Sequence, residues 1–175
     1  MENDLRYPVG KFSRPTAFGT ADRAAAIDAI AALPTALREA VRGLSDAQLD
    51  TPYRPGGWTV RQLVHHVADS HMNAYVRLRL ALTEENPTIK PYDEQKWAAL
   101  ADATSLPVDV SLGILDGIHH RWTVLLHALG PADFARTLLH PDNGPMSLDV
   151  LLALYAWHSR HHVAHVTALR ARSGW

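Results

Sequence analysis

The residues best suited to chemistry are four histidines near the C-terminal end of the chain: His158, His161, His162 and His165. In a helix, where successive residues turn by about 100°, His158, His162 and His165 fall within about 60° of one another, and His161 lies just to the side. A His-x-x-x-His pair on one helical face lets two ring nitrogens meet the same metal ion. The segment therefore predicts a metal site, against the commoner alternative of an unligated polar face.

Two His-x-x-x-His registers fit this helix, His158 with His162 and His161 with His165. Helical geometry barely separates the two registers. The residues that precede His158 on its own face are apolar and should point into the protein core. This pattern favours His158 and His162 as the metal-binding pair, and the other register stays open.

A third ligand must come from elsewhere in the chain, and His66 is the candidate. It lies on a polar stripe of an earlier helical segment, together with Gln62, Asp69, Asn73 and Arg77. In a helix bundle, a polar stripe beside the apolar face marks where helices line a shared cavity. Arg77, at the far end of the stripe, is expected on the solvated outer face.

Asp69 and Asn73 are the candidate catalytic residues, one and two turns beyond His66. Asp69 could accept a proton or orient an imidazole, and Asn73 could orient water or substrate. Three other histidines are not expected to bind the metal. His71 projects toward the apolar side as a buried, hydrogen-bonded residue, whereas His119 and His120 are expected at a solvent-facing or partner-facing position.

The elements that must position these residues are four amphipathic helices. Their apolar residues recur at helical spacing, and Ser or Thr with Gln three residues later marks two of the helical starts. The predicted long helices are about Thr20–Arg42, 59–83, Pro107–Leu129 and from Ser147 to about Arg172. Pro34 should kink or split the first.

The segments outside the four long helices are predicted to contain only short helices and loops. Residues 1–19 are predicted to form an extended arm, residues 45–50 a short helical turn, and Asp93–Leu100 a short extra helix. The segment Leu138–Pro145 is predicted to be a loop, and no alternating strand pattern is present. The fold class is therefore all-α, a four-helix bundle, in a single domain spanning residues 1–175.

Composition narrows the function classes. The 175 residues carry a formal net charge of −1, which suggests neither nucleic acid nor an anionic membrane as a partner. There is no cysteine, so histidine and carboxylate are the available metal ligands. No apolar run approaches the ~20 residues that span a bilayer. A cytoplasmic location is expected.

Several stretches resemble one known family, the DinB-like superfamily and within it the YfiT branch of metal-dependent hydrolases. The second-helix motif is Trp58-Thr59-Val60-Arg61-Gln62-Leu63-Val64-His65-His66-Val67-Ala68-Asp69, and the C-terminal pair is His158-x-x-x-His162. Five further stretches of the chain resemble sequences of this branch: residues 7–10, 52–59, 65–75, 91–94 and 155–162. The resemblance covers essentially the full length.

The resemblance implies a site and a set of partners. Carried over by position, the metal ligands would be His66, His158 and His162. Family members are similar to up-and-down-related four-helix bundles, are often homodimers, and take nickel or zinc. Related enzymes use the metal to activate a low-molecular-weight thiol, such as bacillithiol, for S-transfer.

Three functions remain compatible with these residues. Three neutral imidazoles with an open position suit a Lewis acid that activates water for hydrolysis of a small-molecule substrate. The same position would bind a thiol as thiolate, which gives an S-transferase as the alternative. A non-catalytic metal-binding dimerisation module is the third, and in that case metal removal should collapse the fold.

Overall fold

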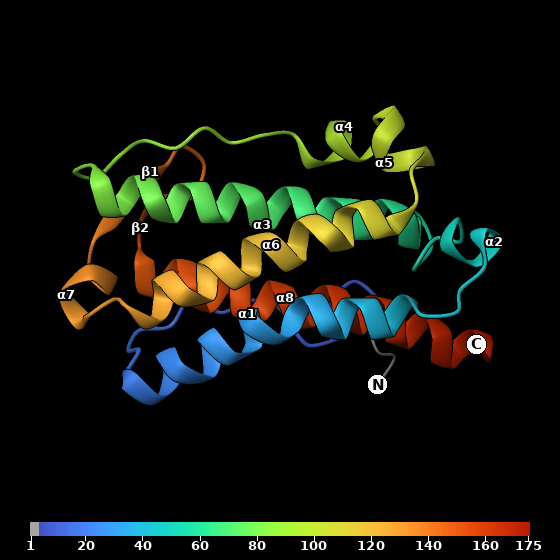
Figure 1. Ribbon diagram of the computed structural model, residues 1–175, viewed down its shortest axis with the longest axis horizontal. Helices are drawn as coiled ribbons and strands as arrows, with labels where there is room; N and C mark the ends of the chain where they lie inside the picture. Colours follow the sequence, from blue (N-terminus) through green and yellow to red (C-terminus); the bar gives the residue numbers. More distant parts are fainter. Residues whose placement is uncertain (1–3) are drawn as a thin grey trace.

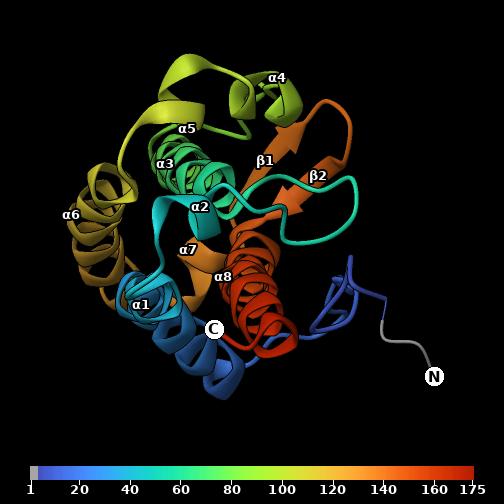
Figure 2. The same cartoon turned by 90° about the vertical axis from the view of Figure 1, so that its right-hand side faces the viewer.

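Four long helices form the body of the protein, of which the computed structural model describes residues 4–175. They are α1 (Thr20–Val41), α3 (Val60–Thr83), α6 (Val108–His127) and α8 (Leu148–Ser173). Seen end-on, the four helices stand at the corners of a square (Figure 2). α1 and α3 are at opposite corners, and each of them contacts both α6 and α8. The predicted four-helix bundle is confirmed.

The order of the helices departs from a simple up-and-down bundle. α1 and α8 run in one direction, and α3 and α6 run in the other (Figure 1). α3 and α6 are parallel because residues 84–107 carry the chain back along α3 before α6 begins. This crossover contains α4 (Glu94–Ala98) and α5 (Ala101–Ser105), both packed on α3. The single short helix predicted over Asp93–Leu100 is therefore one of two.

The connection between α6 and α8 contains a feature that the sequence did not predict. After the short helix α7 (Pro131–Phe134), strands β1 (Thr137–His140) and β2 (Gly144–Ser147) pair antiparallel, where a loop was expected. Leu138 and Met146 are paired and buried, and Gly144 has a φ of +71°. Four residues per strand are too few for a clear alternating pattern, so tertiary burial decides this structure.

Pro34 does not split the first helix. α1 continues from Thr20 to Val41 with Pro34 inside it. A proline removes one backbone hydrogen bond, but the adjoining residues Ile30, Leu33 and Leu37 are all almost completely buried. Packing on both sides of the proline therefore holds the two halves in one helix. The predicted helical turn after α1 is confirmed as α2 (Asp46–Leu49).

The described part of the N-terminal arm, residues 4–19, forms neither helix nor strand and lies against α8, as expected; residues 1–3 lie outside the described residues. The indole Nε1 of Trp157 donates a hydrogen bond of 3.0 Å to the carbonyl oxygen of Gly10. The ring of Phe12 packs on the same indole, with 5.9 Å between ring centroids. Among the described helices, none has the length and apolar character needed to cross a membrane.

The apolar core is divided into two clusters along the bundle, and the four long helices contribute to both. The first cluster includes Ile30, Leu78, Trp122 and Leu152. The second includes Leu37, Val64, Leu115 and Val166. Along α3, α6 and α8, the residues between these two clusters include buried histidines. The bundle therefore has an imidazole layer between two apolar layers.

Arg61 fixes the beginning of α3, the helix that carries His66. Its guanidinium is buried, with Nε donating to Asp50 at 2.7 Å and Nη2 to Asp46 at 2.9 Å. Nη1 donates to the carbonyl oxygen of Leu106 at 3.1 Å. One side chain thus ties α2, α3 and the end of the crossover together through charge-assisted hydrogen bonds.

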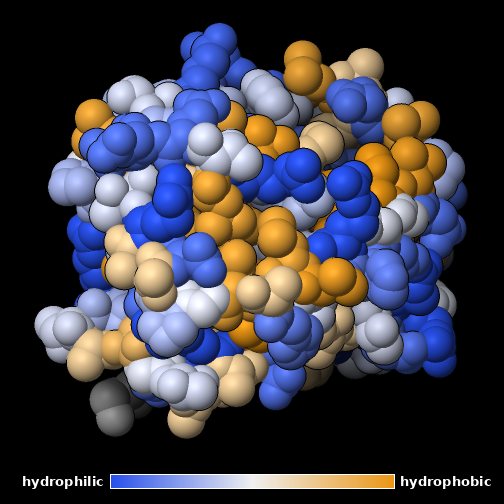
Figure 3. Space-filling view, turned by 60° about the vertical axis from the view of Figure 1, so that its left-hand side comes forward, coloured by the Kyte–Doolittle hydropathy of each residue, from blue (hydrophilic) through white to orange (hydrophobic). Residues whose placement is uncertain are grey.

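Two neighbouring residues of α6 test the assignment of its buried face. Leu115 is fully buried in the second apolar cluster, whereas Ile114 is 40% exposed. Exposed apolar side chains are common on this molecule, and Figure 3 shows them gathered in a band between hydrophilic residues. Their truncation leaves no internal cavity.

Leu115→Ala should lower the free energy of unfolding by about 2–5 kcal/mol, because it removes buried methyl groups and leaves a void. Ile114→Ala should change it by less than about 0.5 kcal/mol. Chemical denaturation of the metal-free protein measures both. Equal losses in the two variants would contradict the helical face described here.

Candidate metal centre

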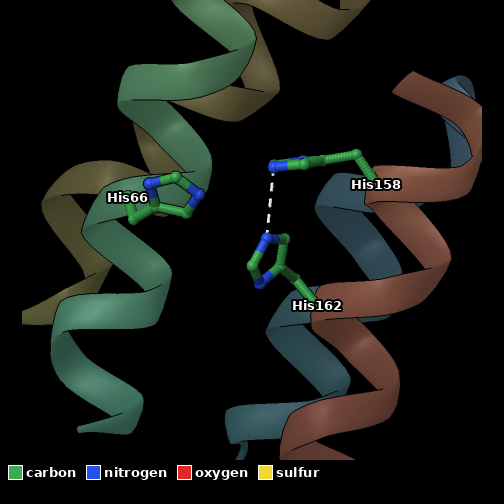
Figure 4. A group of neighbouring side chains, drawn as sticks. All are labelled: His66, His158 and His162. Carbon is green, nitrogen blue, oxygen red and sulfur yellow. Dashed lines mark hydrogen bonds between the residues drawn. The ribbon is translucent and has the colours of Figure 1, made fainter. Parts of the chain in front are cut away.

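Three histidines from two helices meet between α3 and α8. Each of His66, His158 and His162 offers one ring nitrogen, and these nitrogens lie within 4.8 Å of one another. Figure 4 shows the ring of His66 extending from α3 toward the two rings of α8. Within residues 4–175, this is the one group of three or more histidine or carboxylate side chains at such spacing. The three residues that the sequence singled out are thus brought together.

Local structure on α3 aims His66 at α8. The helix starts one residue after Thr59, whose hydroxyl accepts from Gln62 N at 3.1 Å while its own N–H donates to Gln62 Oε1 at 2.9 Å. This reciprocal capping box fixes the helical start, as the sequence predicted. Trp58 packs on the His66 ring at 4.5 Å between centroids, and its Nε1 donates to Gln95 at 3.0 Å.

Burial keeps the three imidazoles uncharged. Desolvation lowers the pKa of His66 to about 4, and the pKa values of His158 and His162 lie well below the ordinary value, again mainly through burial and then through their neighbouring imidazoles. A neutral imidazole has one nitrogen with a free lone pair, which is the form that binds a metal. The centre therefore offers nitrogen donors at neutral pH without first losing protons.

The two α8 histidines face each other directly. Their Nε2 atoms are 3.1 Å apart, close to the separation of about 3.3 Å between two nitrogens on one tetrahedral zinc ion. The Nδ1 atom of His162 is buried and has no hydrogen-bond partner among the described residues. An all-imidazole set of this kind suits borderline divalent ions such as zinc and nickel. The residues present thus fit the group that the sequence implied.

His71 supports His158 from behind. Its Nε2 lies 3.0 Å from Nδ1 of His158, and its side chain is fully buried. When His158 donates from Nδ1 to His71, its Nε2 keeps the lone pair that faces His162. His71 was predicted to be buried and hydrogen-bonded, which is confirmed; its partner could not be predicted, because helical spacing does not show which residue of α8 lies opposite.

His119 is buried, and its predicted solvent-facing position is wrong. It is 2% exposed, its Nδ1 donates to the carbonyl oxygen of Ile30 at 2.7 Å, and its ring stacks on His71 at 4.9 Å between centroids. The reason is that α6 packs against α1 along this face. His120, the next residue, is exposed as expected.

The alternative register, His161 with His165, faces a different environment. Their Nε2 atoms are 3.0 Å apart, so the pair also approaches closely. However, His161 stacks on Trp157 at 4.3 Å and His165 packs on Tyr53 at 4.2 Å between ring centroids. No third histidine or carboxylate of the described chain joins this pair within ligand spacing. The pair that meets His66 is His158 and His162.

A small cavity of about 170 Å³ adjoins His158. It lies between α3, α8, the beginning of α4 and the β-hairpin. Its walls are formed by Ser70, Arg77, Glu94, Leu138, His140, Asn143, Met146, Leu151, Leu154, Tyr155 and His158. Larger hollows border α1, α8 and the N-terminal arm, but the three clustered histidines line none of those. The cavity beside His158 is therefore the candidate substrate site.

Several cavity residues were not recognised from the sequence. Arg77 was expected on the solvated face, but it is half-buried in the cavity wall, because the crossover and the β-hairpin cover this side of α3. Ser70 and Tyr155 share a hydrogen bond of 3.3 Å there. His140 and Asn143 come from the hairpin region, whose position no local pattern revealed.

The two predicted catalytic residues lie near this site but do not line the cavity. Asp69 is half-buried, and burial, followed by the charge of Asp102, raises the pKa of its carboxyl group to about 6. The side-chain amide of Asn73 donates to the backbone oxygen of Asp69 at 2.9 Å. Their catalytic roles stay predictions.

Comparison with known proteins supports the fold and the expected family. Residues 29–166 match the model of the DinB superfamily. A protein of Bacillus mycoides (strain KBAB4), named "Putative metal-dependent hydrolase", is 55% identical over 175 residues, covering 98% of this chain and 99% of that protein. A protein of the same name from Bacillus cereus (strain B4264) is 56% identical over 175 residues and covers 99% of both chains.

Two solved structures are similar to this one. YfiT from Bacillus subtilis, described as a probable metal-dependent hydrolase with an unusual four-helix bundle topology, is 46% identical. The match has a TM-score of 0.96 and covers 98% of this chain and 99% of that one. TT2238, a four-helix bundle protein, has a TM-score of 0.56 at 23% identity, covers 85% of this chain and 98% of that one, and supports the fold alone.

Burial of so many neutral imidazoles makes the stability of the metal-free protein depend on pH. The folded-state pKa values of His66, His119 and His161 are lowered to about 4 and that of His165 to about 3, mainly by burial. In the unfolded chain a histidine takes up a proton near pH 6.5. The unfolded state therefore binds more protons below that pH, and stability is lost as the pH falls.

The free energy of unfolding, measured in urea with a chelator, should therefore fall between pH 7 and pH 5. His165→Phe should reduce this slope by up to about 1.4 kcal/mol per pH unit, because one proton fewer is bound on unfolding. His120→Phe is the matched substitution at an exposed site. The raised pKa of Asp69 has the opposite effect on the pH dependence of stability. Because Asp69 is present in both variants, its effect cancels when their slopes are compared. Identical slopes would contradict the neutral buried state.

Proposed function

The chain belongs to the DinB superfamily, and we propose that it is a metal-dependent hydrolase whose single divalent ion is held by His66, His158 and His162. The observation that carries the proposal is the convergence of three uncharged imidazole nitrogens within 4.8 Å beside a cavity. The names of its relatives support the same reaction class. Zinc or nickel is the proposed ion, since borderline imidazole ligands take both.

The ligand set favours catalysis over a structural role. A structural zinc site is normally closed by four protein ligands, whereas a catalytic site keeps a position open. Among residues 4–175, no fourth histidine or carboxylate joins the cluster. A bound zinc ion would lower the pKa of water to about 7 and so provide a nucleophile at neutral pH.

The surrounding residues hold the substrate and handle protons in this proposal. His71 keeps His158 in the tautomer with a free Nε2. Ser70 and Tyr155 line the cavity and share a hydrogen bond, so the hydroxyl group that accepts this bond can donate its own hydrogen to a substrate carbonyl. Asp69, with a pKa of about 6, can gain and lose a proton near neutral pH, which suits the general-base role predicted for it.

Metal content tests the ligand set. Untagged wild-type protein should contain one equivalent of divalent metal by elemental analysis, and His66→Ala, His158→Ala and His162→Ala should each lose it, because each removes a donor. His161→Ala is the matched control, since it removes a neighbouring imidazole that faces Trp157, and it should keep the metal. Loss in His161→Ala with retention in His158→Ala would assign the other register.

Measurements of catalytic activity and of helicity after chelation distinguish hydrolysis from the two alternatives, S-transfer and a structural metal site. Metal-loaded protein should hydrolyse members of a panel of small esters and amides without added thiol, and chelation should reduce the rate to background. A rate that requires a low-molecular-weight thiol would favour S-transfer instead. The chelated protein should retain its helicity, because two apolar clusters exist apart from the histidines; collapse on chelation would favour a structural metal.

The support of His158 by His71 predicts a change in metal affinity. His71→Leu should raise the dissociation constant about 10- to 100-fold, because the Nδ1–H of His158 loses its acceptor. His71→Gln, which offers an amide oxygen in its place, should recover part of the affinity. Competition with a chromophoric chelator measures both constants. Equal affinities in the Leu and Gln variants would indicate a packing role only.

A further inference from the structure

The cavity beside His158 contains a cation that lacks a carboxylate partner. Arg77 is half-buried in its wall, and Nη2 donates to the carbonyl oxygen of Lys90 at 3.2 Å. No carboxylate oxygen of residues 4–175 lies within 4.0 Å of its guanidinium. By contrast, the guanidinium groups of Arg23 and Arg61 are paired with aspartates. The guanidinium also acts on the neighbouring hydroxyl of Tyr155, whose pKa it lowers against the larger effect of burial. The N–H donors of Arg77 that contact neither this hydroxyl nor Lys90 are available to a ligand.

An anionic group lines the same cavity. Glu94, the first residue of α4, contributes to the wall at the solvent-exposed side of the cavity. Partial desolvation of its carboxyl group raises its pKa, and the charge of Arg77 acts against that rise. The two side chains do not form an ion pair, since their charged atoms are more than 4.0 Å apart. Residues of opposite charge thus line one cavity, which is partly open to solvent, without neutralising each other by direct contact.

The rest of the cavity limits the size of a ligand. Its volume of about 170 Å³ is well below the roughly 300–1,000 Å³ of pockets that hold drug-sized ligands. Leu138, Leu151 and Leu154 give it an apolar side, and His158 belongs to its wall. A ligand held here would be small, would carry both charges, and would reach the histidine cluster.

We infer that the cavity binds a small amino-acid-derived substrate, with its carboxylate on Arg77, its ammonium or N–H group toward Glu94, and the bond to be hydrolysed at His158. The guanidinium fork matches the planar geometry of a carboxylate. A dicarboxylate without a nitrogen would place a second negative charge near Glu94. This inference rests on the proposed metal-dependent hydrolase, because the histidine cluster would supply the reaction.

Three hydroxamates that carry none, one and two charged groups besides the metal-binding group test the inference on the zinc-loaded protein. Acetohydroxamic acid carries only the metal-binding group, succinic monohydroxamic acid adds a carboxylate, and aspartic acid β-hydroxamate adds an ammonium group as well. Calorimetric titration should show at least about tenfold tighter binding of the second than of the first, because a charge-assisted bidentate pair forms. The third should bind more tightly again.

Substitutions of Arg77 and Glu94 test whether these residues cause the two increases in affinity. Arg77→Leu should abolish the advantage of the carboxylate while leaving the affinity for acetohydroxamic acid unchanged, which also shows that the variant is folded. Arg79→Leu is the matched control, since Arg79 is exposed on the same helix and donates to Tyr75 instead. Glu94→Gln should abolish the advantage of the ammonium group.

Two results would overturn the inference and leave the proposed function intact: equal affinity of wild type for the three compounds, or a carboxylate advantage that survives in Arg77→Leu. A gain from the carboxylate that the ammonium group reverses would exclude the amino-acid class. If wild type does not bind acetohydroxamic acid at all, the metal centre itself is absent, and the inference falls with the proposed function.

Discussion

The constraint on which this structure depends is a layer of uncharged imidazoles buried between two apolar clusters. His66, His71, His119 and His162 are buried, and burial lowers the pKa of all four. A buried polar group is costly unless it finds a partner. His71 and His162 each have a hydrogen-bond partner in His158, and His119 donates to a backbone carbonyl. The proposed metal ion would give His66 a partner as well. The same burial that makes the layer costly provides the free lone pairs that a metal needs.

The sequence predicted those parts of the molecule that are determined within one helix. The four long helices follow from apolar spacing, and the capping box at Thr59 and Gln62 forms as expected. The pairing of His158 with His162 depends on one helical turn, and the apolar residues before His158 indicated which face of α8 is buried. His66 was found because it shares a stripe with other polar residues. Each of these signals is local, and each survives because packing agrees with it.

The parts that were not predicted depend on which elements come together in space. The parallel arrangement of α3 and α6 follows from the crossover, and the crossover together with the β-hairpin turns the side of α3 that carries Arg77 into a cavity wall. His119 looked peripheral on its own helix but is enclosed because α1 packs over it. The strands of the β-hairpin are too short to show a recognisable alternation of apolar and polar residues. Burial imposed by a distant segment leaves no trace in local spacing.

The asymmetry of the centre is the strongest physical argument that it acts on a substrate. His66 and His162 are buried, whereas His158 is only partly buried and also lines the cavity. A metal ion held for stability alone would be enclosed on all sides, because water at the site weakens the cohesion that the ion would provide. In this protein the two apolar clusters already surround the layer, so cohesion does not need the ion. What the layer adds is a set of neutral donors at the wall of a cavity where, among residues 4–175, Arg77 and Glu94 form no ion pair with each other. That arrangement would position a small polar molecule against the proposed ion.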